Sequence, residues 1–178
     1  LRRLLGHGAV LRHHQAGQLF EAESLYRQVL AADRRHFGSL HHLGIIALQR
    51  GQAQAALDVI GRAIAIDDRV PDCRYNMAFA LQALGRPSEA AVHYRAAVKL
   101  KPDYVEAHTN LGNVLKELGS YLEAAACYER AIALRPTAEE HCNLANVLSQ
   151  LGRLDEAVTH YRRTIELKPD LVGAHNNL

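Results

Sequence analysis

The feature that most limits the fold of this chain is a glycine that returns at a nearly fixed interval. Gly17, Gly51, Gly85 and Gly119 are spaced 34 residues apart, and Gly152 follows after 33. A constant interval of about 20 to 50 residues is typical of proteins built from one repeated supersecondary unit. Taking each glycine as position 15 divides the chain into units at residues 3–36, 37–70, 71–104, 105–137 and 138–171, with a partial unit at 172–178.

Small side chains recur within each unit where two helices would have to approach closely. Position 20 is alanine in all five units, and position 8 is glycine or alanine in four of them. Larger side chains at positions 7 and 24 would fill the space beside this crossing. The apolar residues are mostly Ala and Leu, with no Trp and three Phe, which also favours helices over a sheet. The pattern predicts an all-α chain of paired helices.

The ends of these helices are marked by proline and glycine. Pro102, Pro136 and Pro169 occupy position 32, where proline cannot continue the preceding helix. The glycine at position 15 supplies the permissive backbone that ends the first helix of each pair. We therefore expect helices at 3–15, 18–32, 37–50, 53–66, 71–84, 87–100, 105–118, 121–134, 138–151 and 154–167, with another that begins at Val172.

The unit that begins at Val105, VEAHTNLGNVLKELGSYLEAAACYERAIALRP, resembles the consensus of the tetratricopeptide repeat. The resemblance covers about 170 of the 178 residues and weakens toward the N-terminus, where Arg34 and Asp68 replace the terminal proline. It implies a right-handed superhelical solenoid of stacked antiparallel hairpins, in which first helices line a concave groove and second helices form the outer face. Stacking is also expected on physical grounds, because one hairpin cannot bury its apolar stripes alone.

The candidate binding residues lie on the first helix of each unit. Positions 2, 5, 6, 9, 12 and 13 share a face of that helix away from the packing stripe. Position 6 is asparagine in four consecutive units, and an amide can both donate to and accept from the main chain of an extended peptide. We expect the groove to bind a protein or peptide partner through Asn76, Asn110, Asn143, Asn177, Asn113, Asn146, His42, Tyr75, Phe79 and Thr109.

Two other functions fit the same groove less directly. The asparagine run and the strings NLGNVLKELG and NLANVLSQLG are similar to the repeat arm of O-linked N-acetylglucosamine transferases, so a substrate-recruiting arm of a larger glycosyltransferase is an alternative. Asparagine at position 6 is also common in generic repeats, where it serves packing or solubility. A clamp for a C-terminal carboxylate is disfavoured, because the corresponding positions lack cations. They hold Tyr75, Glu106, Thr109, Glu139 and Cys142.

The sequence indicates neither a catalytic site nor a metal site. GHGAVL lacks the third glycine of a dinucleotide-binding loop, and no phosphate-binding loop or G-x-S-x-G string occurs. Adjacent histidines at 13–14 and 41–42 would point about 100° apart on a helix, which is a poor arrangement for chelation. His108, His141 and His175 share position 4 and are expected to be half-buried packing groups. We expect no cofactor, no metal and no enzymatic activity in this segment.

Charge and cysteine content indicate the surroundings in which the chain works. A formal net charge of +2 gives no strong field for nucleic acid or membrane, and three cysteines without a C-x-x-C pair fit a reducing, cytoplasmic compartment. The chain closes on VGAHNNL, which matches the opening of another unit, so we expect a longer array. An internal unit leaves an apolar surface for the next one. Self-association through the end at Leu171 and Val172, as a self-assembly module, is therefore a third candidate function.

Overall fold

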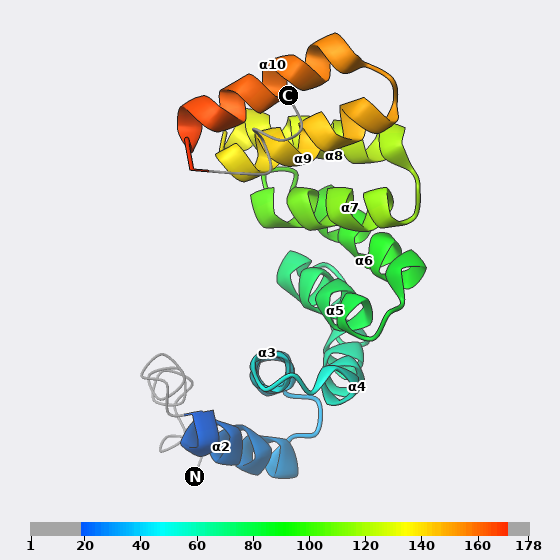
Figure 1. Cartoon of the computed structure of the whole chain (residues 1–178). Coiled ribbons are helices and arrows are strands. Elements are labelled where there is room, and N and C mark those ends of the chain that lie inside the picture. Colours follow the sequence, from blue (N-terminus) through cyan, green and yellow to red (C-terminus); the bar gives the residue numbers. More distant parts are fainter. Residues whose placement is uncertain (1–18, 171–178) are drawn as a thin grey trace. The chain divides into compact units, whose positions relative to one another are not determined.

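The computed structural model describes residues 19–170, which fold into nine α-helices without a strand (Figure 1). Their bounds are α2 (Leu19–Ala32), α3 (Phe37–Gln49), α4 (Ala53–Ile64), α5 (Pro71–Ala83), α6 (Pro87–Leu100), α7 (Val105–Glu117), α8 (Tyr121–Leu134), α9 (Ala138–Gln150) and α10 (Leu154–Leu167). The predicted all-α fold is confirmed, and the predicted helices in this range agree within two residues at each end. The helices expected at 3–15 and from Val172 lie outside the described residues.

Each first helix ends at the repeated glycine, as the sequence predicts. Gly51, Gly85, Gly119 and Gly152 have φ angles of 70°, 69°, 75° and 73°, in the left-handed region that favours glycine. After Gly51, Gly119 and Gly152, the next residue donates its amide to a carbonyl five positions earlier, as in the 2.8 Å bond from Ser120 to the Leu115 oxygen. This is the Schellman arrangement, which satisfies helix carbonyls that would otherwise lack donors.

The chain separates into two compact units, residues 1–85 and 86–178. Among the described residues, unit 1 contains α2 to α5 and unit 2 contains α6 to α10. The boundary falls between the two helices of the third repeat, 71–104. One continuous array over residues 1–178 stays a prediction.

Unit 1 is held together by a core between α2, α3 and α4. Tyr26 of α2 is buried with Leu43 and Ile46 of α3, and α3 packs against α4 as well as α2. A Cβ atom added at Gly44 would lie 2.3 Å from Cγ1 of Ile60 on α4. Position 8 must therefore be small for α3 and α4 to cross at this distance, which confirms the predicted crossing.

Unit 2 repeats the same crossing with a larger partner side chain. The hairpins α7–α8 and α9–α10 pack within themselves, and α8 packs against α9. A Cβ atom at Gly112 would lie 2.8 Å from Cε1 of the buried Tyr128 ring. The position-20 residues Ala124 and Ala157 are buried as predicted. None of the helices within residues 19–170 combines the length and hydropathy needed to cross a membrane.

Candidate functional site

Four asparagines of unit 2 lie on α7 and α9, which pack beside each other. Asn110 and Asn143 occupy position 6 of their repeats, while Asn113 and Asn146 occupy position 9, and all four side chains are partly exposed. We call these four residues the α7–α9 face. Four of the predicted binding residues thus lie on two neighbouring helices of one unit.

Two amides of the α7–α9 face are held in place by tyrosines of the following helices. The Tyr128 hydroxyl donates to Oδ1 of Asn113 at 2.7 Å, and the Tyr161 hydroxyl donates to Oδ1 of Asn146 at 2.7 Å. Each bond uses the carbonyl oxygen of the amide as the acceptor and fixes the orientation of that side chain. The second repeat replaces this polar pair with Ile45 at position 9 and Ile60 at position 24.

A cavity of about 640 Å³ adjoins this face. Its polar lining includes Asn146, whose amide nitrogen also lies 3.8 Å from Sγ of Cys142. Lys116 of α7 lines the same cavity and supplies a cation that the sequence analysis did not single out. Its position, number 12 of the repeat, is among those predicted to face the groove. The remaining lining residues are Tyr121, Ser149, Gln150 and Tyr161.

The prediction that Thr109 faces an open groove is wrong. Its side chain is buried between α7 and α9, and its hydroxyl lies 3.2 Å from the Val105 carbonyl oxygen and 3.2 Å from Oε1 of Glu140. Position 5 of α7 is covered because the first turn of α9 packs directly against it. Thr109 therefore joins two first helices of unit 2 and is not available to a ligand.

The predicted binding residues of unit 1 lie on α3 and α5, which are in contact. The Asn76 amide nitrogen donates to Nε2 of His41 at 3.2 Å, so this amide links the two helices. His42 stacks on Tyr26 with ring centroids 5.2 Å apart, and its Nδ1 lies 2.7 Å from the Gly38 carbonyl oxygen. His42 is thus a packing group in this arrangement.

The aromatic candidates of α5 differ in their exposure. Phe79 is 44% exposed, whereas Tyr75 is half-buried. Burial lowers the pKa of His41, which keeps its ring neutral and able to accept the bond from Asn76. Asn177 lies outside the described residues, and because Asn76 belongs to unit 1, the continuous amide ladder stays a prediction.

The cysteines are not poised as nucleophiles. Burial raises the pKa of Cys73 to about 12 and that of Cys127 to about 11. Burial likewise raises the pKa of Cys142, against a smaller lowering by the hydrogen bond from Asn146. These thiols stay protonated at neutral pH, and a thiol reacts as its thiolate. Within residues 19–170, no three His, Cys, Asp or Glu side chains are grouped closely enough to hold a metal ion.

The position-4 histidines are packing groups, as expected. His141 is buried, and its Nδ1 lies 2.9 Å from Nδ1 of His160 on α10. His108 is partly buried, with Nε2 3.1 Å from the Pro102 carbonyl oxygen. His175 lies outside the described residues.

Comparison with known families and proteins identifies the repeat. A tetratricopeptide-repeat family model matches residues 103–170, a second one matches 83–119 and a third matches 9–71. Curated relatives include Superkiller complex protein 3 of Mus musculus, 35% identical over 105 residues, and of Homo sapiens, 31% identical over 102 residues. Each match takes in 57% of this chain, which spans only 6% of the length of those relatives.

Solved structures share the fold at low sequence identity. MamA superposes with a TM-score of 0.83 at 22% identity, over 89% of this chain and 93% of MamA. YrrB, described as a tetratricopeptide-repeat protein with an unusual peptide-binding site, superposes with a TM-score of 0.86 at 20% identity, over 94% of this chain and 87% of YrrB. The special similarity to glycosyltransferase arms stays a prediction. From the three family matches and the repeated hairpins, we conclude that residues 9–71 and 83–170 consist of tetratricopeptide repeats.

Proposed function

We propose that this chain is a protein-interaction scaffold whose α7–α9 face binds an extended segment of a partner protein. The observation that carries the proposal is the pair of hydrogen bonds from Tyr128 to Asn113 and from Tyr161 to Asn146. An amide held by such a bond loses little further freedom when it binds, which reduces the entropic cost of association.

The chemistry of this face suits the main chain of a peptide. The NH₂ groups of Asn113 and Asn146 can donate to backbone carbonyls, while the position-6 amides of Asn110 and Asn143 can both donate and accept. Main-chain bonds of this kind hold many sequences, as in other modes that recognise extended peptides. Selectivity would come from the neighbouring cavity, where Lys116 favours an acidic side chain.

Support by analogy comes from YrrB, which shares the fold and is described as having a peptide-binding site. The proposal assigns no bond-making step to these residues. The four amides are partly exposed, whereas the buried residues of α7 and α9 are chiefly apolar.

The test is to change Asn110 and Asn143 together to Ala and to measure binding of the full chain to an array of short, unrelated peptides. Loss of two neutral hydrogen bonds should weaken binding about tenfold across sequences that differ in side chains. Gln54→Ala is the control, because it removes an exposed amide of α4 in unit 1. Peptide binding that is equal in the double variant and the control would contradict the proposal.

A further inference from the structure

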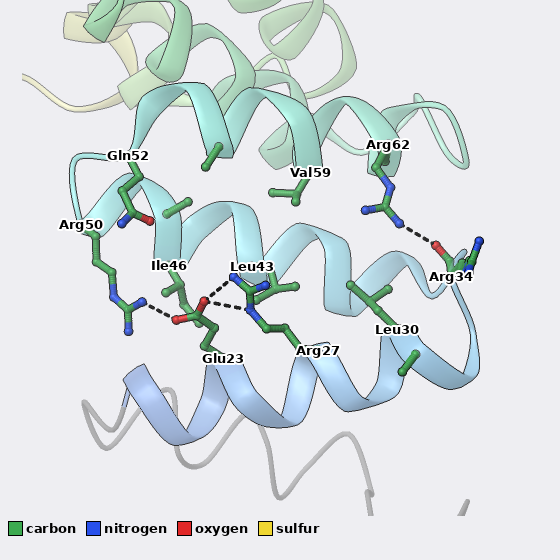
Figure 2. A pocket seen from close by; sticks show the side chains of 13 residues that line it. Glu23, Arg27, Leu30, Arg34, Leu43, Ile46, Arg50, Gln52, Val59 and Arg62 are labelled. Carbon is green, nitrogen blue, oxygen red and sulfur yellow. Dashed lines mark hydrogen bonds and ion pairs between the residues drawn. The ribbon is translucent and has the colours of Figure 1, made fainter.

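Unit 1 has a surface of its own that combines an apolar floor with a rim of arginines. It is a cavity of about 530 Å³ bounded by α2, α3 and α4 (Figure 2). Its floor is formed by Leu30, Leu43, Ile46, Ala47 and Val59, and Leu43 and Ile46 belong to the core of the unit. This surface, which we call the arginine groove, is separate from the α7–α9 face of unit 2.

Four arginines surround the floor, namely Arg27, Arg34, Arg50 and Arg62. Glu23 is the one acidic residue among the lining side chains, so the rim carries a formal excess of three positive charges. The Arg27 side chain is 71% exposed and that of Arg50 is 31% exposed. Such guanidinium groups are accessible to a ligand while their stems cover apolar surface.

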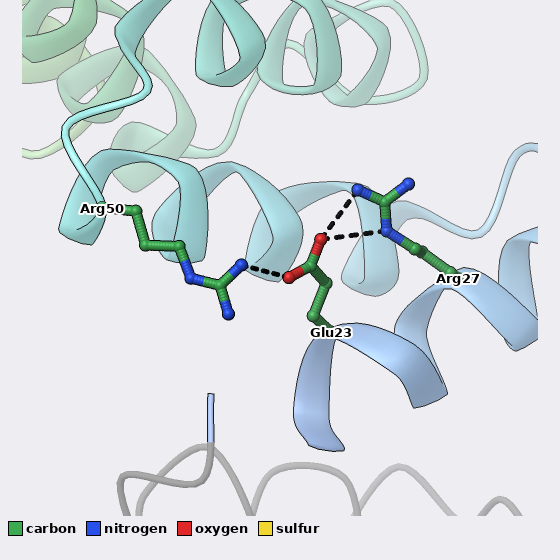
Figure 3. Close-up of polar contacts among 3 residues, drawn as sticks. All are labelled: Glu23, Arg27 and Arg50. Atoms are coloured by element: carbon green, nitrogen blue, oxygen red, sulfur yellow. Dashed lines mark hydrogen bonds and ion pairs between the residues drawn. The ribbon is translucent and has the colours of Figure 1, made fainter. Parts of the chain in front are cut away.

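Glu23 holds two of these arginines over the floor. One carboxylate oxygen accepts from Nη2 of Arg27 at 2.7 Å, and the other accepts from Arg50 (Figure 3). The bond from Arg27 lowers the pKa of Glu23, which therefore stays ionised at neutral pH. Glu23 thus occupies the position that a carboxylate of a ligand would take between the two guanidinium groups.

The remaining cations extend the surface along the unit. Nη2 of Arg62 donates to the Arg34 carbonyl oxygen at 3.1 Å, which joins α4 to the turn between α2 and α3. Both residues also line an adjoining cavity of about 230 Å³, to which Arg35 contributes another guanidinium group. The floor of that second cavity includes Leu40 and Ile66. The two cavities share Arg34 and Arg62, so the combination of apolar floor and cations extends beyond either cavity alone.

We propose that the arginine groove binds a segment of a partner protein in which acidic and aliphatic residues alternate. Carboxylates match the planar fork of arginine and form charge-assisted bonds with it, while the aliphatic side chains would cover the exposed part of the floor. Single-stranded nucleic acid fits less well. The cavity that holds the four arginines is lined by no aromatic side chain on which a base could stack.

The test uses the full chain and a fluorescein-labelled peptide of alternating glutamate and leucine, with binding followed by fluorescence anisotropy. Changing Arg27 and Arg50 together to Ala should weaken binding by at least about tenfold, because both charge-assisted contacts are lost. Glu23→Gln should strengthen it several-fold, since the competing charge is removed while the side-chain shape is kept. Arg95→Ala is the matched control. That residue is an exposed arginine of α6 that pairs with Glu123 of the neighbouring repeat.

Three results would overturn the proposal. One is a glutamate–leucine peptide that fails to bind or that binds equally well to the double arginine variant. Another is equal binding of a lysine–leucine peptide, which would show that charge plays no part. The third is tighter binding of oligouridylate through the same arginines, which would assign the groove to nucleic acid. If the double variant loses its helical circular dichroism, Arg62→Ala and the gain expected from Glu23→Gln still decide the question.

Discussion

The arginine groove of unit 1 and the same repeat positions of unit 2 share a framework and differ in charge. Position 25 is Arg27 on α2 but Glu129 on α8, and position 14 is Arg50 after α3 but Leu151 after α9. Arg62 has a counterpart, Arg163, which pairs with Glu166 of its own helix at 2.7 Å.

This difference shows which parts of a repeat are under structural constraint. The residues at positions 8 and 20 are buried at the crossing in both units. These positions stay small because a large side chain there would separate the helices. Positions 14 and 25 lie outside the crossing, so the charge of their side chains can be lost or reversed without affecting the hairpin. The charge of each outer surface is therefore free to specify a partner, while the inner positions specify the fold.

The largest effect is expected when unit 1 receives the residues of unit 2 at these positions. Arg27→Glu combined with Arg50→Leu should lower affinity for the glutamate–leucine peptide by about 100-fold, since two charge-assisted contacts are lost and one repulsive charge is added. Fluorescence anisotropy of the full chain measures the change. Arg95→Glu, in unit 2, should leave the affinity as it is. If the double variant binds the glutamate–leucine peptide as tightly as the unchanged chain does, the charges at positions 14 and 25 do not determine binding.

The next effect concerns the crossing, where the two units are expected to behave alike. Gly44→Ala and Gly112→Ala should each lower the free energy of unfolding by about 2 kcal/mol, because the added Cβ would meet Ile60 or Tyr128. Chemical denaturation measures this. The control is Gly61→Ala, in the interior of α4, where a Cβ would lie 3.6 Å from Cε of Met77, an ordinary contact.

Gly61→Ala should be neutral or should stabilise by up to about 1 kcal/mol, since alanine is the better helix former. Equal effects of all three glycine substitutions would mean that close approach at the crossing does not limit either unit.

A smaller effect separates the buried tyrosines of the two units. The Tyr128 hydroxyl donates to Asn113, whereas the buried Tyr26 hydroxyl has no hydrogen-bond partner among the described residues. Tyr128→Phe should therefore destabilise the chain by about 1 kcal/mol, while Tyr26→Phe should leave stability unchanged or slightly raised. Thermal denaturation of the two variants side by side measures the difference. A larger loss of stability in Tyr26→Phe than in Tyr128→Phe would contradict this prediction.

The smallest effect is a dependence of stability on pH that is stronger in unit 2. Burial lowers the pKa of His141 and of His160, and their Nδ1 atoms, 2.9 Å apart, cannot both carry a proton. Because the unfolded histidines titrate near 6.5, the folded chain should lose stability as the pH falls below that value. Glu129 and Glu156 oppose the lowering at His160, while Arg163 adds to it at His141.

Unit 1 carries Leu40 and Val59 at the positions of these two histidines, which supplies the variant for the pH test. His141→Leu with His160→Val should flatten the pH dependence in denaturation curves recorded above and below pH 6.5. Some dependence should remain, because burial also lowers the pKa of His41 and His108. If the double variant keeps the same pH dependence of stability, groups other than His141 and His160 cause it.

The helices and their crossings could be predicted from the sequence, whereas the state of each polar group could not. The predicted bounds of α3 and α7 each differ by a single residue from those observed. Asn110 and Asn143 are partly exposed, whereas the predicted face was wrong for Thr109, which α9 covers. A face assigned from one helix takes no account of the neighbour that packs on it.

The sequence by itself determined the hairpins, because a left-handed glycine, a small residue at a crossing and a proline at a helix end act over a few residues of backbone. The tertiary structure decided which polar side chains stay available. Tyr128 and Asn113 meet across two helices. The arginine groove gathers charges from residues 27 to 62 that no single repeat contains. Such contacts depend on how separate helices pack, and that arrangement is specified by the whole buried surface rather than by any local pattern.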